Sequence, residues 1–466
     1  MQTDTHVKDA PLARFGMFIA SLMERWFPDA FVFALVAVVV VFLFGLGVGE
    51  APLVLVKAFG DGFWSLVPFT MQMILVIVGG FVVASSRPCA ALIRRVASWP
   101  QSPRSAVAFV ALFSMATSMV SWGFSLIFTG LLVRELVRRL DGLDFRAVGA
   151  AAYLGLGGVW ALGLSSSAAM MMATPSAMPK ELIAISGVIP LSQTIFLWQS
   201  LLIATVLIAL SVTIAWFSCP APANAKTAAM MGIHFDDPAI ADDPAQTPAE
   251  KLEHSPLLTL LAVALMLFYL GMKIREKGPV AALDLNNFNL AFIAFGMLLH
   301  WRPRSFLKAV ANSVPATSGV LIQFPFYAGI FGLITYTSIE HTLSGFFASI
   351  ATRDSYNVIV SLYSFVLGVF IPSGGGKWVV EAPYVMHAAS ELKMHLGWTV
   401  QTYNAAEALP NLLNPFFMLP LMGILNAKAR DLVGYSILQL LFHAPVVIVL
   451  CWLLAYTLPY VPPVIP

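Results

Sequence analysis

The residues best suited to chemistry lie in and just after the segment Ile371-Pro372-Ser373-Gly374-Gly375-Gly376-Lys377-Trp378. Lys377 and Glu381 are four residues apart, so on a helix their side chains share one face. The lysine could attract an anion to this point, or the two charges could pair and neutralise each other in an apolar environment. Ser373 and Lys377 could instead act as nucleophile and base of an intramembrane hydrolase.

The backbone of this segment is as unusual as its side chains. A proline and three consecutive glycines cannot continue a helix, so we expect the chain to open here and to leave polar groups unpaired. Inside a membrane, open backbone is tolerated only where it is buried in protein or lines a watery cavity. A binding site is therefore expected here, provided that the surrounding chain spans a membrane.

Three further segments combine glycine or proline with small polar residues: Ser121-Trp122-Gly123, Gly163-Leu164-Ser165-Ser166-Ser167 and Asn411–Pro415. A break in a helix exposes N–H groups that suit a carboxylate and C=O groups that suit a cation. Each serine could alternatively serve only to join neighbouring helices. The candidate substrate-binding residues are Ser121, Trp122, Gly123, Ser165, Ser166, Ser167, Ser373, Gly374, Gly375, Gly376, Lys377, Asn411, Asn414, Gln72 and Gln323.

A cation, Na+ or H+, is the other species that the carbonyl ends of these breaks would suit. Glu407 could accept a proton, face a cation or lie at a wetter helix end. The three cysteines have neither metal-ligand spacing nor the pattern of a disulfide framework. Candidate cation sites lie near Gly163, Ser165, Asn411, Asn414 and Glu407.

The composition is that of a membrane protein. Hydrophobic residues make up 59% of the chain, charged residues 11%, and the mean hydropathy is +0.83. Because the alternation of a membrane barrel is absent, an all-α polytopic protein is predicted. The net charge of +2 and the lack of a basic–aromatic stripe argue against a nucleic-acid partner. Uncharged runs long enough to span a bilayer are Phe31–Gly49, Phe63–Ser86, Ser105–Val133, Ala147–Pro179, Ala309–Ile339 and Leu432–Pro466.

One of these runs, Ser105–Val133, has arginines at both ends, and positive residues favour the cytoplasm. Its 29 residues would form a helix of roughly 43 Å, longer than a hydrocarbon core of about 30 Å. We therefore predict a re-entrant hairpin with its tip at Ser121–Gly123, the alternative being one long tilted helix.

An internal repeat organises the chain. An offset of 251 residues brings Gln72 onto Gln323, Trp122-Gly123 onto Ser373-Gly374 and Gly163-Leu164 onto Asn414-Pro415. We predict two inverted-topology repeats, each with four crossings, one of them a broken helix, and one re-entrant hairpin. The expected divisions are an amphipathic N-terminal segment (1–29), repeat one (30–218), an acidic linker plus an unmatched connecting helix (219–280) and repeat two (281–466).

The Lys and Arg residues in the connections between spans predict the topology. On this plan 18 Lys and Arg residues face the cytoplasm and 7 face outside, with Lys377 inside the hairpin. The N-terminus is then cytoplasmic and the C-terminus periplasmic. Two connections are expected to lack regular structure: the loop at Glu50–Gly62, and the solvated linker at Cys219–His254.

Several of these motifs resemble the short-chain fatty acid (acetoacetate) permease family, over nearly the whole chain. They are Gly60-Asp61-Gly62-Phe63-Trp64, Met71-Gln72-Met73, Gln323-Phe324-Pro325-Phe326-Tyr327-Ala328-Gly329-Ile330, Pro372-Ser373-Gly374-Gly375-Gly376 and Asn414-Pro415-Phe416.

The resemblance implies uptake of short-chain carboxylates such as acetoacetate or butyrate across a bacterial inner membrane, not enzymatic activity. It further implies an elevator mechanism on a homodimeric scaffold in lipid, with cation coupling; a channel is the remaining alternative. Departures from the family pattern lie beside the proposed site. The family has His at Lys377, Gln at Glu381, Gly at Ala382 and Ser166, and Pro at Ala169.

Overall fold

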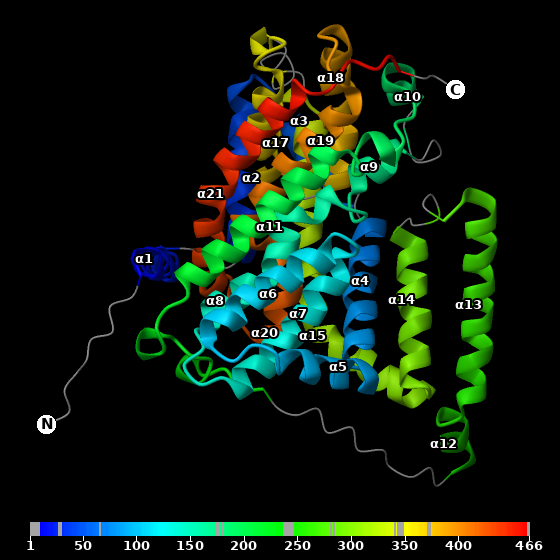
Figure 1. Cartoon of the computed structure of the whole chain (residues 1–466). Coiled ribbons are helices and arrows are strands. Elements are labelled where there is room, and N and C mark those ends of the chain that lie inside the picture. Colours follow the sequence, from blue (N-terminus) through cyan, green and yellow to red (C-terminus); the bar gives the residue numbers. More distant parts are fainter. Residues whose placement is uncertain are drawn as a thin grey trace, which may run out of the picture.

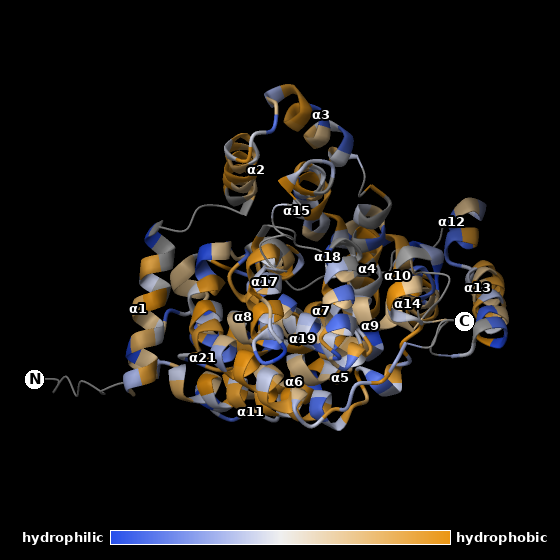
Figure 2. Cartoon of the chain, turned by 90° about the horizontal axis from the view of Figure 1, so that it is seen from above, coloured by the Kyte–Doolittle hydropathy of each residue, from blue (hydrophilic) through white to orange (hydrophobic). Residues whose placement is uncertain are grey.

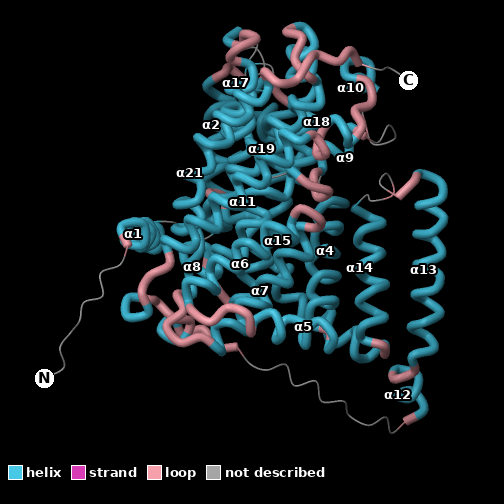
Figure 3. The backbone as a smooth tube through the Cα atoms, in the orientation of Figure 1, coloured by secondary structure: helices cyan, strands magenta, loops and turns pink. Residues whose placement is uncertain are grey.

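The computed structural model describes residues 10–26, 30–64, 67–173, 178, 180–235, 247–279, 282, 285–339, 342, 349–370 and 374–463. Every regular element within these ranges is helical (Figure 3). By length and composition, five of the described helices could cross a membrane, or six if one bent pair counts as a single span. The chain is thus a polytopic α-helical membrane protein, as its composition predicts.

The first half begins with a helix that lies across the others. Figure 1 views α1 along its axis, whereas the long helices are seen from the side. α4 and α5 form the bent pair, at 74°. The elements of this half are α1 (Pro11–Trp26), α2 (Ala30–Gly47), α3 (Pro52–Phe63), α4 (Val67–Ser85), α5 (Arg87–Ala97), α6 (Pro103–Ser118), α7 (Trp122–Arg139), α8 (Phe145–Leu154), α9 (Ser167–Met172), α10 (Lys180–Ser186) and α11 (Trp198–Ser218).

Helices α6 and α7 form a hairpin. The Ser125 hydroxyl donates to the Ser114 carbonyl oxygen at 2.6 Å, and Phe113 stacks on Phe128 with ring centroids 5.2 Å apart. Both contacts join residues at nearly equal distances along the chain from the turn, so the helices are antiparallel. This geometry excludes one long straight helix over Ser105–Val133. The turn lies at residues 119–121, since Trp122 already begins α7.

The helix after this hairpin is broken, as its glycines and serines predict. α8 passes into a π-helical turn, η1 (Gly155–Val159), and a 3-10 turn, η2 (Trp160–Leu162), before α9 begins at Ser167. Two glycines of this stretch lie against backbone of the hairpin. A Cβ atom on Gly155 would be 2.2 Å from Ser114 O, and one on Gly163 would be 2.3 Å from Met119 O. Only glycine permits such an approach.

The second half contains another antiparallel hairpin, α17 with α18, whose hydroxyls of Tyr363 and Tyr384 lie 2.8 Å apart. Residues 371–373 lie outside the described ranges. The elements of this half are α12 (Pro248–Glu253), α13 (Pro256–Lys277), α14 (Leu285–His300), α15 (Pro303–Thr335), α17 (Tyr356–Phe370), α18 (Gly374–Glu391), α19 (Leu396–Ala408), η7 (Leu409–Leu412), η8 (Pro415–Met418), α20 (Leu419–Leu425) and α21 (Ala429–Ala455).

Three expectations need correction. Glycines 374–376 form the first turn of α18 and are not open loop, because first-turn N–H groups need no partner within the helix. The loop expected at Glu50–Gly62 is helix α3, which begins at Pro52 and buries Leu55, Ala58 and Gly62, at near-helical spacing. The expected linker is partly packed, since Cys219 is buried and Asp144 accepts a hydrogen bond from Lys226 N.

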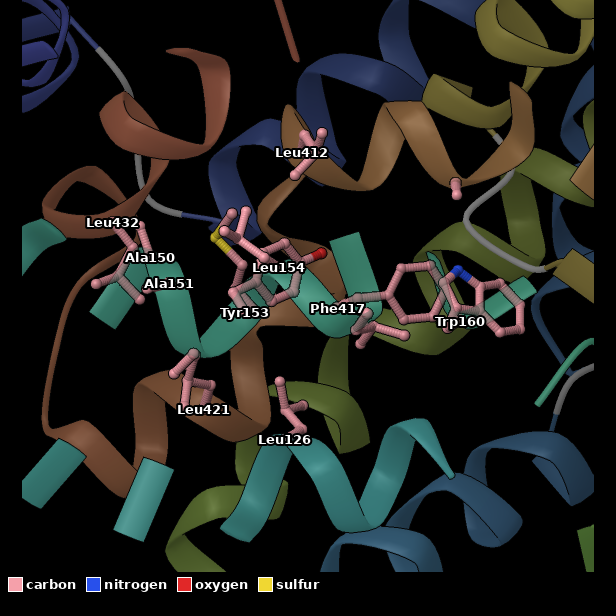
Figure 4. Packing of buried hydrophobic residues seen from close by; sticks show 14 of the residues in the cluster. Leu126, Ala150, Ala151, Tyr153, Leu154, Trp160, Leu412, Phe417, Leu421 and Leu432 are labelled. Carbon is pink, nitrogen blue, oxygen red and sulfur yellow. The ribbon is translucent and has the colours of Figure 1, made fainter. Parts of the chain in front are cut away.

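The core lies where the two halves meet. Apolar side chains of α7 and α8 pack there against residues of η7, η8 and α20 (Figure 4). Viewed from above, α13 stands at one edge of the molecule, and α2 and α3 stand at another (Figure 2). α13 is largely exposed and apolar, as a lipid-facing helix is.

Candidate functional site

The tip of the first hairpin is hydrogen-bonded to the broken helix that follows it. The Ser165 hydroxyl donates to Ser118 O at 2.8 Å and accepts from Trp122 N at 2.9 Å. Leu164 N donates to Met119 O at 2.8 Å. The tip and the break are therefore one joined structure, in which Ser165 bonds both ends of the turn.

The two broken helices also meet each other. The Tyr153 hydroxyl donates to Asn411 O at 2.9 Å, and the Asn411 amide donates to Leu156 O at 3.3 Å. Figure 4 shows Tyr153 and Trp160 on the first broken helix and Leu412 on the second. These reciprocal bonds hold the irregular turn of the first broken helix, η1, against the irregular turn of the second, η7.

The second hairpin completes the convergence. The Asn414 amide donates to Val369 O at 3.2 Å, which ties the second break to the end of α17. A Cβ atom on Gly374 would lie 2.6 Å from Trp160 Cη2, and one on Gly375 would lie 3.2 Å from Ser167 Cβ. The start of α18 therefore packs directly against the first broken helix because its residues lack side chains.

A charged cluster lies just beyond these glycines. Lys377 and Glu381 are 0% exposed and Glu407 is 2% exposed. Lys377 Nζ lies 2.8 Å from Ser364 O, 3.9 Å from Glu381 Oε2 and 4.6 Å from the centroid of the Tyr403 ring. Glu381 Oε1 accepts a short hydrogen bond from the Ser364 hydroxyl. Lys377 and Glu381 thus share one helix face, as their spacing predicts.

Glu407 approaches the same cluster from α19. Tyr403, one turn earlier, donates its hydroxyl to Gly374 O at 2.6 Å. A Cβ atom on Gly374 would be 3.3 Å from Glu407 Oε1, so this carboxyl group lies at the start of α18. Glu407 Oε2 has no hydrogen-bond partner among the described residues. A buried carboxylate oxygen without a partner is costly, which makes this position a candidate for a further ligand.

The structure gives the predicted site residues different surroundings. The four-segment convergence contains Trp122, Ser165, Ser167, Gly374, Gly375, Lys377, Asn411 and Asn414. Gly376 belongs to the first turn of α18. Ser121 and Ser166 cap helices: the Ser121 hydroxyl accepts a hydrogen bond from Phe124 N, and the Ser166 hydroxyl accepts one from Ala169 N. Gly123 is buried in the first turn of α7. Ser373 lies outside the described residues.

The two glutamines, matched by the repeat, differ in their surroundings. Gln72 is half-exposed on α4 and donates to Asn286 Oδ1 at 2.8 Å. Gln323 is 3% exposed on α15, and its Oε1 atom lacks a hydrogen-bond partner among the described residues. It precedes Tyr327 by one turn, and the Tyr327 hydroxyl interacts with the Asn414 side chain. Gln323 therefore faces toward the second break, whereas Gln72 makes no contact there among the residues that the structure describes.

Sequence reasoning missed the residues that enclose the cluster. Trp160, Ser364 and Tyr403 contact the glycines or the charges. Tyr403 carries a usable signal, because it lies one turn before Glu407. Ser364 and Trp160 carry none, since each reaches the cluster through contacts distant in sequence. Among the described residues, no group of three or more His, Cys, Asp or Glu could hold a metal ion.

Comparisons with known proteins agree with the membrane architecture. The family model for short chain fatty acid transporters matches residues 11–454. Two relatives named as candidate short-chain fatty acid transporters are similar: one from Escherichia coli K12, 34% identical over 443 residues, and one from Haemophilus influenzae, 31% identical over 451 residues. Each alignment covers 94% of this chain and 99% of the relative.

Two solved structures also resemble the chain. The MtrF antimetabolite efflux pump of Neisseria gonorrhoeae has a TM-score of 0.47 at 14% identity, over 96% of this chain and all of that one. The YdaH transporter of Alcanivorax borkumensis has a TM-score of 0.40 at 16% identity, over 95% of this chain and all of that one. From the family model and the two relatives, the chain belongs to the short chain fatty acid transporter family.

Proposed function

We propose that this protein is a secondary-active transporter of short-chain carboxylates such as acetoacetate or butyrate. The observation that carries the proposal is the position of Lys377, a buried cation at the point where two helical hairpins and two broken helices meet. The family and its relatives are described as transporters, which favours transport over catalysis.

The start of α18 offers a carboxylate two kinds of partner. The N–H groups of its first turn have no acceptor within the helix, and Lys377 adds a full positive charge. Trp160, Trp378 and Tyr403 supply apolar surface beside these groups. A small carboxylate with a short apolar tail matches this combination. On binding, Lys377 would replace part of its contact with Glu381 by a contact with the substrate carboxylate.

The plan of two inverted repeats, with the divisions given above, has support from the element bounds. Adding 251 to the first residues of α6, α7, α8 and α9 gives 354, 373, 396 and 418. The corresponding helices α17, α18, α19 and α20 begin at 356, 374, 396 and 419. In Figure 1 the first hairpin occupies the lower part of the molecule and the second occupies the upper part. Hairpins that enter from opposite membrane faces would have this arrangement.

The proposal includes an elevator movement. The hairpins and broken helices would form the transport unit, and α2, α3, α4, α14 and α15 would form a dimerising scaffold in the bacterial inner membrane. α15 packs against α2, α3 and α4, which supports a continuous scaffold of this kind. Movement would be coupled to Na+ or H+, with a cytoplasmic N-terminus and a periplasmic C-terminus.

An intramembrane hydrolase built on Ser373 and Lys377 is less well supported. Lys377 Nζ donates to Ser364 O and lies 3.9 Å from Glu381 Oε2, so the nitrogen that would have to act as the base is already engaged within the cluster. A channel would share the polar centre, but its uptake rate would not saturate with substrate concentration.

The deciding experiment is uptake of labelled acetoacetate, butyrate and longer carboxylates into proteoliposomes, with and without Na+ and H+ gradients. Saturable uptake that competing short-chain carboxylates inhibit, above that of protein-free liposomes, is expected. Uptake that rises linearly with concentration would indicate a channel. Failure to transport any short-chain carboxylate would refute the proposed substrate class.

A further inference from the structure

We propose that Glu407 carries a proton that is taken up with each substrate carboxylate, so that the coupling ion of this transporter is H+. The inference rests on the proposed function and extends it to a specific residue and ion. It follows from the charges of the buried cluster, from their hydrogen bonds and from the position of Glu407 at the start of α18.

The charges of the cluster do not balance. Lys377 contributes one positive charge, and Glu381 and Glu407 contribute two negative charges when both are ionised, all within protein interior. A substrate carboxylate adds another negative charge to the same place. An unpaired charge is expensive in a membrane interior, so binding of the anion favours uptake of one positive charge.

The groups that face Glu407 make it sensitive to this charge. Lys377 and Glu381 on α18 interact with it electrostatically, as do the phenol groups of Tyr403 on α19 and Tyr153 on α8. Lys377 is the one cation among these facing groups. Because Glu381 already pairs with that cation, a substrate that recruits Lys377 leaves both carboxylates less compensated.

Of the two carboxylates, Glu407 is the better proton acceptor. Glu381 Oε1 is held by the Ser364 hydroxyl, and Glu381 Oε2 lies 3.9 Å from Lys377 Nζ. Neither Glu381 Oε2 nor Glu407 Oε2 has a hydrogen-bond partner among the described residues, but Glu381 Oε2 faces the Lys377 ammonium, whereas the Glu407 carboxyl group lies beside Gly374. Of the two, Glu407 is therefore the carboxyl group with an oxygen that neither a hydrogen bond nor the Lys377–Glu381 ion pair engages, at the place where the substrate is expected to arrive.

A proton suits this position better than a metal cation. The Lys377 ammonium belongs to the same cluster and would repel a second full charge. A proton instead converts the Glu407 carboxylate into a neutral acid, which can also donate a hydrogen bond. One carboxylate and one proton would enter together, the net charge of the cluster would not change, and both would leave on the other side.

The test is calorimetry of potassium butyrate binding to the purified protein in detergent, at one pH, in phosphate and in Tris. The difference in heat between buffers of unlike ionisation enthalpy gives the number of protons taken up per butyrate. Detergent solution avoids passive diffusion of butyric acid through a bilayer. We expect about one proton per butyrate for the wild type, by linkage between the two binding events. Glu407→Gln should bind butyrate without proton uptake, whereas the matched control Glu381→Gln should retain it.

Three outcomes would overturn the inference. They are butyrate binding by the wild type without proton uptake, unchanged proton uptake in Glu407→Gln, and loss of uptake in Glu381→Gln instead. The wild-type measurement alone decides the coupling ion if Glu407→Gln does not fold. Absence of any carboxylate binding to the folded wild type would instead refute the proposed function, and the inference with it.

Discussion

The Tyr403 hydroxyl donates a 2.6 Å hydrogen bond to the Gly374 carbonyl oxygen. This bond joins α19 to the first turn of the second hairpin's inner helix, beside Trp160 and Glu407. Since a first-turn carbonyl is normally engaged only within its own helix, the phenol acts as an external support for the glycine segment. The position of the N–H groups at the start of α18 therefore depends on a side chain of the neighbouring helix.

Tyr403→Phe should weaken substrate binding without preventing insertion. The variant removes one buried hydrogen bond, worth about 1 kcal/mol or roughly fivefold in affinity. The half-saturation concentration for labelled butyrate in proteoliposomes measures the effect. Tyr384→Phe, which alters a hydroxyl pair elsewhere in the hairpin, is the matched control. Equal kinetics in the two variants would contradict a role for Tyr403 at the site.

Gly374→Ala should be more harmful than Gly375→Ala. A Cβ atom at residue 374 would lie 2.6 Å from Trp160 Cη2, whereas one at residue 375 would lie 3.2 Å from Ser167 Cβ. Overpacking of this kind costs about 1–3 kcal/mol, and it would push the start of α18 away from the broken helix. Uptake rate per inserted protein is the measurement. A larger loss in Gly375→Ala would show that the close contact with Trp160 is not limiting.

Changes at Lys377 and Glu381 separate substrate contact from simple neutralisation. If Lys377 binds the carboxylate, Lys377→Met should raise the half-saturation concentration, and Glu381→Gln should change it little. If the lysine only neutralises Glu381, each single variant should lower membrane-inserted yield and the double variant should restore it, because removal of both partners is often neutral. Unchanged affinity in Lys377→Met would exclude substrate contact.

Lys377→His introduces the residue of the family pattern into the same cluster. It should shift the preference among carboxylates without abolishing uptake, because the histidine side chain is shorter than that of lysine and its imidazole titrates near neutral pH. Competition of labelled butyrate uptake by acetoacetate and longer carboxylates gives the preference. Complete loss of uptake in a normally inserted variant would mean that the length of the lysine is indispensable.

The inverted topology predicts opposite labelling of two exposed positions. In a protein whose native cysteines have been replaced, Lys251→Cys should react with an impermeant maleimide only from the cytoplasm. Lys393→Cys should react only from outside. Intact cells and inverted vesicles give the two sides. Reaction of both positions from one side would disprove the inverted arrangement.

Local sequence rules predicted the interruptions of the fold well. The arginines around Ser105–Val133 and its excess length indicated the first hairpin, and Gly163–Ser167 indicated the first break. The same rules failed at Glu50–Gly62, because the glycines and charges near its end masked the helical spacing of Leu55, Ala58 and Gly62. They also failed for glycines 374–376, which a helix start accommodates.

The sequence predicted the site residues that lie close together along the chain, but not the residues that other helices bring to the site. The spacing of Lys377 and Glu381 required their shared face, whereas the approach of Glu407 depends on how α19 packs against α18. The repeat suggested equal roles for Gln72 and Gln323. At the 251-residue offset, α3 and α4 correspond to the single helix α15, so the two glutamines lie on different structures. A shared sequence offset cannot show that difference.

The bonds that Ser165 makes have a mechanical consequence. They end on Ser118 O and Trp122 N, which are main-chain atoms, and the contacts of Gly155 and Gly163 likewise meet main-chain carbonyl groups. Main-chain atoms cannot swing aside as a side-chain rotamer can. We therefore expect the first hairpin and the broken helix behind it to move as one rigid unit, so that a displacement of either carries the other with it.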